Sequence, residues 1–414
     1  MPGRGAPAID LRPHLRAGDG VWWGQAAGEA TPLVDALLDQ VADLGPLRAF
    51  CGLTFNRRLR TVPAELSLIS YGAMGELRAL GRTGRLGVVP AHYSALPRLF
   101  AERLLPCDVG LVQVSPPGPD GLCSLGVGAD YAADAVPHSR VLIGEINHRM
   151  PATAGSSRIP IARFAATVET DRPLPEAADR APDAVDYAIA ARVAALVDDG
   201  DTVQMGVGAL PAAIMDGLAD HRDLGFHAGM ITDGVVRLVE KGVLTGRRKE
   251  IDNGLVITGT AIGSADLYAG LAGMPVQFRP ASYTHNPRVL GRLATLVAIN
   301  SAVQVDLAGQ VGGESVRGRY VGGIGGQADF SGAAARTGAR SIIALRSTSG
   351  GESTLVAGLD GPVSTARADV DAVVTEHGTA WLRGCSLTEI GPRLTAIAAP
   401  EHRDELNRAL REDA

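Results

Sequence analysis

The sequence predicts an α/β protein built from two related open α/β/α domains with mostly parallel sheets. Short apolar runs typical of strands alternate with segments of helical spacing, a pattern that calls for parallel sheets covered by helices on both faces. The chain has 414 residues, enough for two or three domains. Hydrophobic residues make up 46% of it and charged residues 20%, so it can bury a full core.

The first half opens with a strand, a glycine-containing turn and a helix. Gly18–Gly24 reads as a turn and a short strand, and Glu29–Leu38 follows with helical spacing. Pro32 lies near the start of that helix, where proline is tolerated. Three further runs are predicted as strands because they are apolar and end at or near Gly, Pro or Asn. These are Leu86–Val89, Val109–Val114 and Arg140–Ile146.

The opening pattern returns in the second half. Gly200–Gly206 repeats the first Gly, the Asp, the Val and the last Gly of Gly18–Gly24, and each copy runs into a proline-led helix, here at Pro211. This repetition predicts two related halves. Residues 168–184 are rich in proline and acidic residues and are predicted as the linker, which leaves domains at 1–167 and 185–414.

The remaining elements of the second half follow from the same periodicities. The predicted helices are Val185–Asp198, Asp233–Lys241 and Pro400–Arg411, and the predicted strands are Leu296–Ile299, Ser341–Leu345 and Ala372–Thr375. Ligands of parallel sheets bind in the loops at the carboxyl ends of the strands. We therefore look for the site in the glycine-rich loops.

Composition argues against several classes of protein. The formal net charge is -6 with no basic block, which argues against a nucleic-acid partner. The four cysteines show neither CxxC spacing nor a metal pattern, so free thiols in a reducing compartment and no metal are expected. Residues 1–10 lack a signal-peptide pattern, and no apolar run approaches the roughly 18 residues of a membrane span. We expect a cytoplasmic homo-oligomer without a membrane partner.

Two glycine-rich loops are the candidate binding elements. Tyr320–Phe330 holds four glycines in five residues, and its successive amides can form a nest for a phosphate or an oxyanion. Gly206–Pro211 follows a strand and opens a helix, where a phosphate would meet free amides and the positive end of the helix dipole. It is neither a Rossmann fingerprint nor a P-loop, because the third Gly and the Lys-Ser/Thr pair are absent.

Six stretches occur in an order that is typical of one protein family. They are Gly24–Pro32 (GQAAGEATP), Gly206–Pro211 (GVGALP), Gly225–Gly234 (GFHAGMITDG), Gly322–Phe330 (GGIGGQADF), Ser347–Gly351 (STSGG) and Val373–Gly384 (VVTEHGTAWLRG). Together they resemble the acetyl-CoA hydrolase/transferase family, the single-chain class I CoA-transferases. The resemblance implies a CoA-transferase-like fold and coenzyme A or an acyl-CoA as the substrate.

The resemblance assigns two sets of residues. The expected CoA contacts are Gly206, Val207, Gly208, Ala209, Leu210, Gly322 and Ser349. The expected oxyanion position is at Gly325 and Gly326. The family nucleophile is a glutamate in the segment resembling Gly225–Gly234, where this chain has Gly229. Because glycine cannot form an acyl anhydride or a thioester, ordinary ping-pong transfer is not expected.

Several residues are candidates to replace the missing glutamate. His227 is the titrating group nearest to Gly229, and its ordinary pKa suits water activation. Glu145 at the end of a strand is retained as a candidate catalytic carboxylate, with Glu314 and Glu352 after Gly-Gly pairs as further candidates. A structural His227 is the alternative. His285 is expected to be a solvated loop histidine, and Glu376 a structural residue.

The expected activity is therefore hydrolysis of a thioester, or of a C–C bond, in an acyl-CoA. Two alternatives stay open. The chain could be an acyl-CoA:carboxylate CoA-transferase with a relocated carboxylate, or a CoA-binding protein without catalytic activity.

Overall fold

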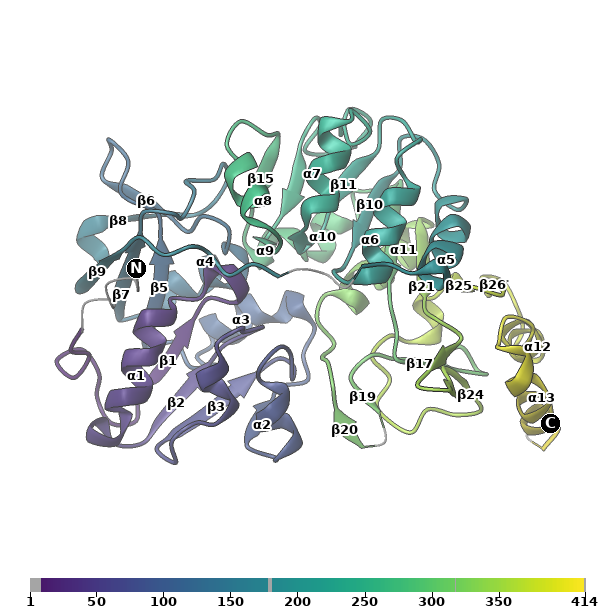
Figure 1. Cartoon of the computed structure of the whole chain (residues 1–414), viewed down its shortest axis with the longest axis horizontal. Helices are drawn as coiled ribbons and strands as arrows, with labels where there is room; N and C mark the ends of the chain where they lie inside the picture. Colours follow the sequence, from purple (N-terminus) through teal and green to yellow (C-terminus); the bar gives the residue numbers. More distant parts are fainter. Residues whose placement is uncertain (1–8, 178–180, 317, 413–414) are drawn as a thin grey trace. The chain divides into compact units, whose positions relative to one another are not determined.

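The computed structural model describes residues 9–177, 181–316 and 318–412 (Figure 1). The chain forms two compact units. One runs to residue 177 and also takes in residues 257–284, and the other holds the residues from 181 to 256 and from 285 onward. The segment predicted as the linker, 168–184, begins inside a strand of the first unit. The domain bounds predicted from the sequence placed residues 257–284 in the second domain, whereas in the structure they belong to the first unit.

The first unit is built on a parallel sheet with the strand order β4-β3-β2-β1-β5-β7-β9. Both β1 and β5 are buried along their whole length, as expected for strands covered on both faces. The three strands predicted after the first helix are present. The bounds are β1 Gly20–Trp23, β2 Leu47–Phe50, β3 Leu66–Ser70, β4 Leu86–Val88, β5 Val109–Val114, β7 Val141–Asn147 and β9 Ala166–Thr170.

Helix α1 (Thr31–Leu44) is longer than the predicted Glu29–Leu38. Its apolar stripe continues past Leu38 to Val41, and the helix ends at Gly45, which has a φ of 83°. The other helices of the unit are shorter. They are α2 Arg78–Arg82, α3 Leu96–Ala101, α4 Asp130–Ala135, α8 Ala265–Gly270 and α9 Ala281–Thr284, with 3-10 turns at Ala26–Gly28, Arg57–Arg60, Tyr93–Ala95, Val136–His138 and Ile161–Arg163.

The second unit repeats the arrangement of the first around β10. Its strands run in the order β11-β10-β16-β21-β25-β26, parallel except for the last pair. Strand β10 lies between β11 and β16 as β1 lies between β2 and β5, which matches the sequence repeat. The bounds are β10 Thr202–Met205, β11 Gly225–His227, β16 Leu296–Asn300, β21 Arg340–Ala344, β25 Ala372–Thr375 and β26 Gly378–Trp381.

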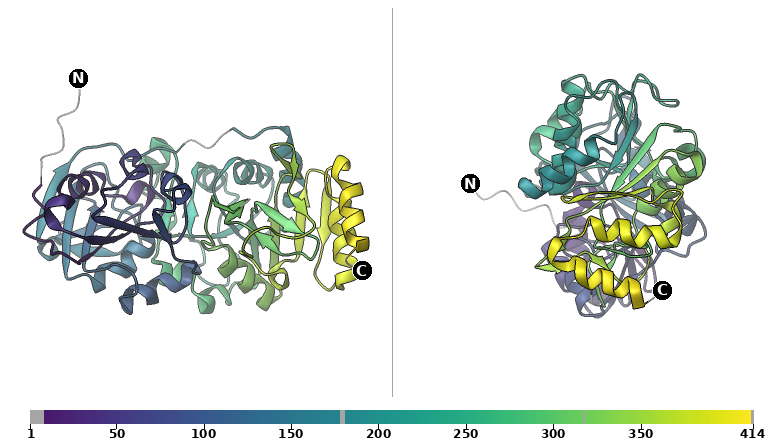
Figure 2. Two further views of the ribbon diagram at one scale, coloured as in Figure 1. Left: turned by 90° about the horizontal axis from the view of Figure 1, so that it is seen from below. Right: turned by 90° about the vertical axis from the view of Figure 1, so that its right-hand side faces the viewer.

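The helices of the second unit include four that were predicted, one of them the helix led by Pro211. Helix α5 (Ala184–Ala194) starts at a capping box made by Asp183 and packs against α6 (Ala209–Gly217) (Figure 1). Figure 2 shows α12 (Leu387–Ala396) beside α13 (Arg403–Glu412), where Leu394 and Leu406 share one core. Helix α13 starts later than predicted because Pro400–His402 forms a 3-10 turn. The others are α7 Asp233–Glu240, α10 Pro287–Leu290 and α11 Gln327–Thr337, with a 3-10 turn at Arg367–Asp369.

Short strands complete the two units. Strand β6 pairs with β8, and β18-β17-β24 forms a small sheet. The bounds are β6 Leu122–Ser124, β8 Arg158–Pro160, β12 Met230–Ile231, β13 Val256–Thr258, β14 Thr260–Ala261, β15 Val276–Phe278, β17 Gln304–Asp306, β18 Val311–Gly312, β19 Ser315–Val316, β20 Arg319–Tyr320, β22 Thr348–Ser349, β23 Glu352–Ser353 and β24 Leu355–Val356.

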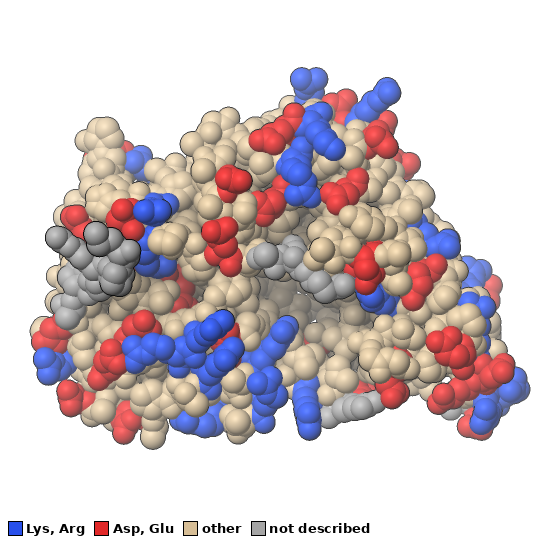
Figure 3. Space-filling view, in the orientation of Figure 1, with Lys and Arg blue, Asp and Glu red and all other residues tan. Residues whose placement is uncertain are grey.

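Surface and side-chain chemistry give few further constraints. Among the described residues, none of the helices combines the length and the hydropathy that a membrane crossing needs. The same residues contain no cluster of His, Cys, Asp and Glu side chains that could hold a metal ion. All four cysteines are free thiols. Basic and acidic side chains are interspersed over much of the face drawn in Figure 3.

Candidate functional site

The second unit contains a cavity of about 1100 Å³ at the carboxyl ends of its central strands. Each of three strands leads into a segment that lines it. Val207–Pro211 follows β10, Ser301–Gln304 follows β16, and Thr348–Gly350 follows β21. Five of the predicted CoA contacts, Val207, Gly208, Ala209, Leu210 and Ser349, line the cavity, whereas Gly206 and Gly322 do not.

The cavity meets the N-terminus of helix α6. Gly208 caps that helix with a φ of 127°, a conformation that other residues rarely adopt. A Cβ built at Gly208 would have only the Cδ of Pro211 nearby, at 3.8 Å. Glycine is therefore required here by the backbone conformation, because there is enough space for a side chain. The first amides of a helix have no partner within it, so those of Ala209 and Leu210 are suited to an anion.

One arginine in the cavity lining is neutralised by acidic neighbours. Arg346 forms ion pairs of 2.7 Å with both Asp183 and Asp186 at the start of α5. The Arg346 guanidinium donates hydrogen bonds to the carboxylates of Asp186 and Asp183, and these bonds hold its pKa above the ordinary value. The two aspartates thus hold the guanidinium of Arg346 in position and compensate its positive charge.

The predicted oxyanion loop joins a strand to a helix. It runs from β20 to α11, where Gly325 has a φ of 56° and Gly326 is the N-cap residue. The amides of Val321 and Gly322 donate to the carbonyl oxygen of Glu314, at 2.7 and 3.1 Å. The loop is therefore anchored to Glu314 by two backbone hydrogen bonds.

The two candidate glutamates of the second unit, Glu314 and Glu352, lie in different environments, and so does Glu376, which was expected to be structural. The carboxylate of Glu314 is buried and accepts hydrogen bonds from the hydroxyls of Tyr320 (2.5 Å) and Ser364 (2.8 Å). Glu376 accepts from the amide and the hydroxyl of Ser347, at 2.9 and 2.7 Å, which agrees with a structural role. Glu352 is exposed and lines the cavity.

His285 packs directly against Gly229 and Gly326. A Cβ built at Gly229 would lie 2.8 Å from Cε1 and 3.0 Å from Nε2 of His285. A Cβ at Gly326 would lie 2.6 Å from Cδ2 and still closer to Nε2. Real Cβ contacts are not this short, so the ring fills space that side chains at either position would need.

The expectation that His285 is a solvated loop histidine was wrong. Its side chain is 4% exposed, and its ring meets that of Phe330 edge-on with centroids 5.1 Å apart. The segment has loop-like residues, but α9 ends at Thr284 and α10 starts at Pro287, so His285 lies in a short connection facing the core. Burial, and secondarily the charge of His227, lowers the pKa of His285 to about 3.

His227 is the last residue of β11 and is fully buried. Its ring centroid lies 6.5 Å from that of Phe330. His227, Gly229, His285, Gly326 and Phe330 thus form one cluster, which we call the glycine–histidine cluster. The sequence pointed to His227, Gly229 and Gly326 but missed His285.

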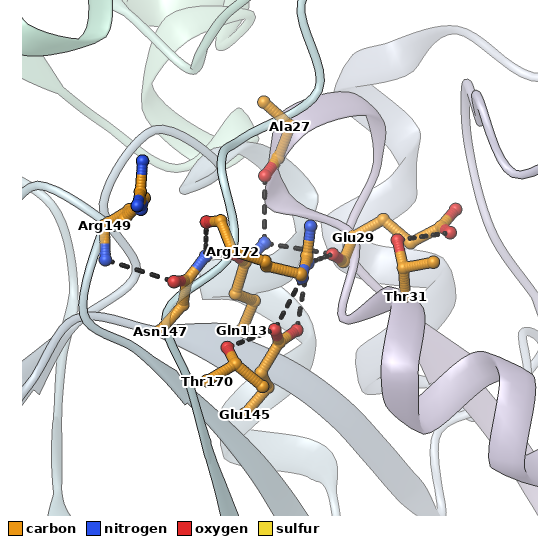
Figure 4. Close-up of polar contacts among 9 residues, drawn as sticks. All are labelled: Ala27, Glu29, Thr31, Gln113, Glu145, Asn147, Arg149, Thr170 and Arg172. Carbon is orange, nitrogen blue, oxygen red and sulfur yellow. Dashed lines mark hydrogen bonds and ion pairs between the residues drawn. The ribbon is translucent and has the colours of Figure 1, made fainter. Parts of the chain in front are cut away.

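Glu145 belongs to a separate polar network in the first unit (Figure 4). It lies in β7, is fully buried, and forms a bidentate pair with Arg172, at 2.6 and 3.0 Å. The hydroxyl of Thr170 donates to it at 2.7 Å. Arg172 also donates to the carbonyl oxygen of Glu29, at 2.7 Å. Both oxygens of this sequence-predicted catalytic candidate are thus engaged by donors.

Glu29 is a buried carboxyl that the sequence did not single out. The hydroxyl of Thr54 donates to it at 2.5 Å and that of Thr31 at 3.1 Å. Burial raises the pKa of Glu29 to about 7, although the hydrogen bonds oppose this. In the sequence it reads as the first residue of a helix, where acidic residues are common, so no signal marked it.

Glu29→Gln is expected to flatten the dependence of stability on pH. Because the pKa of Glu29 is about 7 in the folded chain and 4.5 as its ordinary value, the folded state holds the proton more tightly. Its stabilising contribution is present below about pH 4.5 and is lost as pH rises through 7. Between pH 5 and pH 8, the free energy of unfolding of the variant should therefore rise by about 1–3 kcal/mol relative to that of the wild type.

Urea titrations followed by tryptophan fluorescence would measure this difference. Trp22 and Trp23 are buried in the first unit and Trp381 is 42% exposed in the second, so most of the change in fluorescence reports unfolding of the first unit. Asp130, whose pKa burial also raises to about 7, is present in both proteins and cancels in the comparison. Equal changes for variant and wild type between the two pH values would contradict a buried, proton-binding Glu29.

Comparison with known proteins decides the family. The acetyl-CoA hydrolase/transferase N-terminal domain matches residues 7–197, and the C-terminal domain of the same family matches residues 263–410. The chain belongs to the acetyl-CoA hydrolase/transferase family. It is 35% identical to the 4-hydroxybutyrate coenzyme A transferase of Clostridium kluyveri over 93% of this chain and 92% of that protein. It is 29% identical to the succinyl-CoA:cyclohexane-1-carboxylate CoA transferase of Geobacter metallireducens, over 97% and 94%.

Solved structures agree with this membership. RipA from Yersinia pestis superimposes with a TM-score of 0.90 at 32% identity, covering 99% of this chain and 97% of that one. The 4-hydroxybutyrate CoA-transferase from Porphyromonas gingivalis gives 0.81 at 33% identity, covering 97% and 95%. The family resemblance and the predicted α/β fold with mostly parallel sheets are therefore confirmed.

Proposed function

We propose that this member of the family hydrolyses acyl-CoA, at the thioester or at a C–C bond of the acyl group, and does not pass CoA to a carboxylate. One observation carries the proposal. At Gly229, where the family resemblance expects a glutamate nucleophile, the space around the absent side chain is filled by the imidazole of His285. Without a carboxylate at that position, water is the available nucleophile.

The arrangement supports thioester hydrolysis in the following way. The CoA moiety lies in the second-unit cavity, which is at the upper end of the size of small-molecule sites. A phosphate group of CoA meets the amides of Ala209 and Leu210 at the start of α6. Water adds to the thioester carbonyl carbon near the Gly325–Gly326 turn, whose amides stabilise the negative oxygen. The C–S bond then breaks, and the leaving sulfur takes the proton lost by water to give the free thiol.

CoA transfer is the second candidate, because the relatives named above are CoA-transferases. It requires another carboxylate as the nucleophile. Glu145 and Glu314 are buried and Glu376 is partly buried, whereas Glu352 is exposed on the cavity lining. Glu352 is therefore the carboxylate that a transferase mechanism would use.

Thiol release distinguishes the candidates. The chain is incubated with acetyl-, butyryl-, succinyl- or 4-hydroxybutyryl-CoA, with and without acetate. A hydrolase releases thiol without acetate, a transferase consumes another acyl-CoA and forms acetyl-CoA only with acetate, and a binding protein does neither but binds CoA in calorimetry. Transfer that depends on acetate, without thiol release in its absence, would contradict the hydrolase proposal.

Gly208→Ala is expected to raise the Kd for CoA by about tenfold. An alanine must leave the φ of 127° or hold it under strain, and either change turns the α6 amides away from the anion. Gly338→Ala is the matched control, since Gly338 has a φ of 79°, open space around it and no contact with the cavity. Calorimetry with CoA and a thermal melt of both variants measure the two effects. Equal Kd values for the two variants would contradict CoA binding at α6.

A further inference from the structure

We propose that Glu314 is a positioning residue, whose buried carboxylate fixes the predicted oxyanion loop, Tyr320–Phe330, so that the amides of the Gly325–Gly326 turn meet the negative oxygen formed on the thioester. The inference rests on the proposed function and adds to it the residue that holds the turn in place. It also gives a role to a carboxylate that is buried beside the loop and is not itself the nucleophile.

The backbone of Glu314 holds the start of the loop. Its carbonyl oxygen accepts hydrogen bonds from the amides of Val321 and Gly322, at 2.7 and 3.1 Å. A Cβ built at Gly322 would lie 2.6 Å from the carbonyl oxygen of Gly313. Real Cβ contacts are not this short, so the two backbones pack directly on each other here. The start of the loop therefore lies on the Gly313–Glu314 backbone.

The side chain of Glu314 makes a second connection to the loop. It is 2% exposed, and its Oε2 accepts a hydrogen bond from the hydroxyl of Tyr320 at 2.5 Å. Tyr320 is the residue of β20 that pairs with Ser315 in β19, directly after Glu314. Burial, and then the hydrogen bond to Glu314, raises the pKa of the Tyr320 phenol, so the hydroxyl keeps its proton and can donate it.

Ser364 holds the carboxylate from another side. Its hydroxyl donates to Oε1 of Glu314 at 2.8 Å and accepts a hydrogen bond from the amide of Gly313, also at 2.8 Å. A buried carboxylate costs more free energy than an apolar side chain of similar volume, so packing alone would not favour it. What the carboxylate adds is bond strength, because hydrogen bonds to an ionised acceptor are roughly twice as strong as neutral ones.

The same segment also lies beside the end of the turn. A Cβ built at Gly313 would be 3.9 Å from Oε1 of Gln327, the first residue of α11. Gly325, with a φ of 56°, and Gly326, the N-cap of α11, lie between the contacts at Gly322 and Gln327. A change at Glu314 is therefore expected to move the amides of the turn, and a misplacement of about 1 Å can lower a rate about 100-fold.

Three single variants of the full-length chain test the inference in whichever reaction the wild type carries out, thiol release or transfer to acetate. Glu314→Ala removes both side-chain acceptors and is expected to lower kcat about 100-fold. Glu314→Gln keeps one acceptor, and Tyr320→Phe removes one donor, so each should lower kcat about tenfold. The Kd for CoA in calorimetry should stay within about twofold, because free CoA has no acyl carbonyl.

A double variant and a control identify the cause. If Glu314 acts through Tyr320, adding Tyr320→Phe to Glu314→Gln should lower kcat no further than Glu314→Gln alone. Asp371→Asn is the control for destabilisation. Asp371 is a buried carboxylate of the same unit that pairs with Arg383, but it precedes β25 and does not line the cavity. This control should lower the melting temperature and leave kcat unchanged.

The outcomes separate the inference from the function on which it rests. A wild-type chain that neither hydrolyses nor transfers any of the four acyl-CoAs overturns both. An active wild type with an equally active, folded Glu314→Ala overturns the inference alone, and Glu314→Gln and Tyr320→Phe decide in the same way if the alanine variant does not fold. Additive losses, or an equal loss in Asp371→Asn, also overturn it. A non-additive loss of kcat with an unchanged Kd for CoA supports it.

Discussion

Gly229→Glu is expected to abolish the native activity and to destabilise the second unit by about 1–3 kcal/mol. The φ of Gly229 lies outside the left-handed region, so the backbone accepts any residue, and space decides the outcome. The first atom of the new side chain would lie 2.8 Å from Cε1 of His285. Either the ring leaves its place or the backbone at Gly229, between β11 and β12, moves. A thermal melt and the thiol-release assay measure the two effects.

A second substitution identifies the cause. In Gly229→Glu with His285→Ala, the clash is removed, and at least about 1 kcal/mol of the lost stability should return as a coupling between the two positions. The double variant is also the protein in which CoA transfer to acetate is expected, because its carboxylate can occupy the space that the ring fills. Gly229→Ala is the control for the Cβ atom alone. A single Gly229→Glu variant that is as stable and as active as wild type would contradict the proposed packing.

The sequence predicted most strands of the two central sheets because each is a short, largely apolar run. Strands β5 and β25 have the predicted bounds, since burial on both faces makes these runs mostly apolar, with Gln113 and Thr375 as their polar residues. Helix α11 was not predicted. Its sequence, QADFSGAAART, has small residues and a glycine in place of a clear apolar stripe, and only packing against β21 and β16 makes it a helix.

The candidate site was predictable only where local backbone chemistry defines it. The glycine turns at Gly206–Pro211 and Tyr320–Phe330 have signatures within a few residues, so they could be found. His285 could not, because its role depends on two glycines that are far away in the sequence and meet it only after folding. Glu29 and its buried carboxyl escaped for the same reason, since Thr54 and Arg172 approach it through tertiary structure.

Arg172→Met is expected to destabilise the first unit by about 3–5 kcal/mol. The side chain of Glu145 has no solvent exposure, and its charge is compensated by the bidentate pair with Arg172. Removing the cation leaves a buried carboxylate with the Thr170 hydroxyl as its remaining donor among the bonds drawn in Figure 4. The carbonyl oxygen of Glu29 loses a donor as well. Urea titration followed by the fluorescence of buried Trp22 and Trp23 measures the loss.

The partner and the control variants make this prediction specific. Adding Glu145→Gln to Arg172→Met should recover most of the loss, because a neutral amide does not need the cation. Arg149→Met is the control in the same network, since its ion pair with Asp171 has both side chains more than half exposed and should contribute less than about 1 kcal/mol. If Arg172→Met and Arg149→Met lower the free energy of unfolding by the same amount, Glu145 is not a buried charge that depends on Arg172. A catalytic Glu145 makes the opposite prediction for activity, because Glu145→Gln would then abolish thiol release in a chain that stays folded.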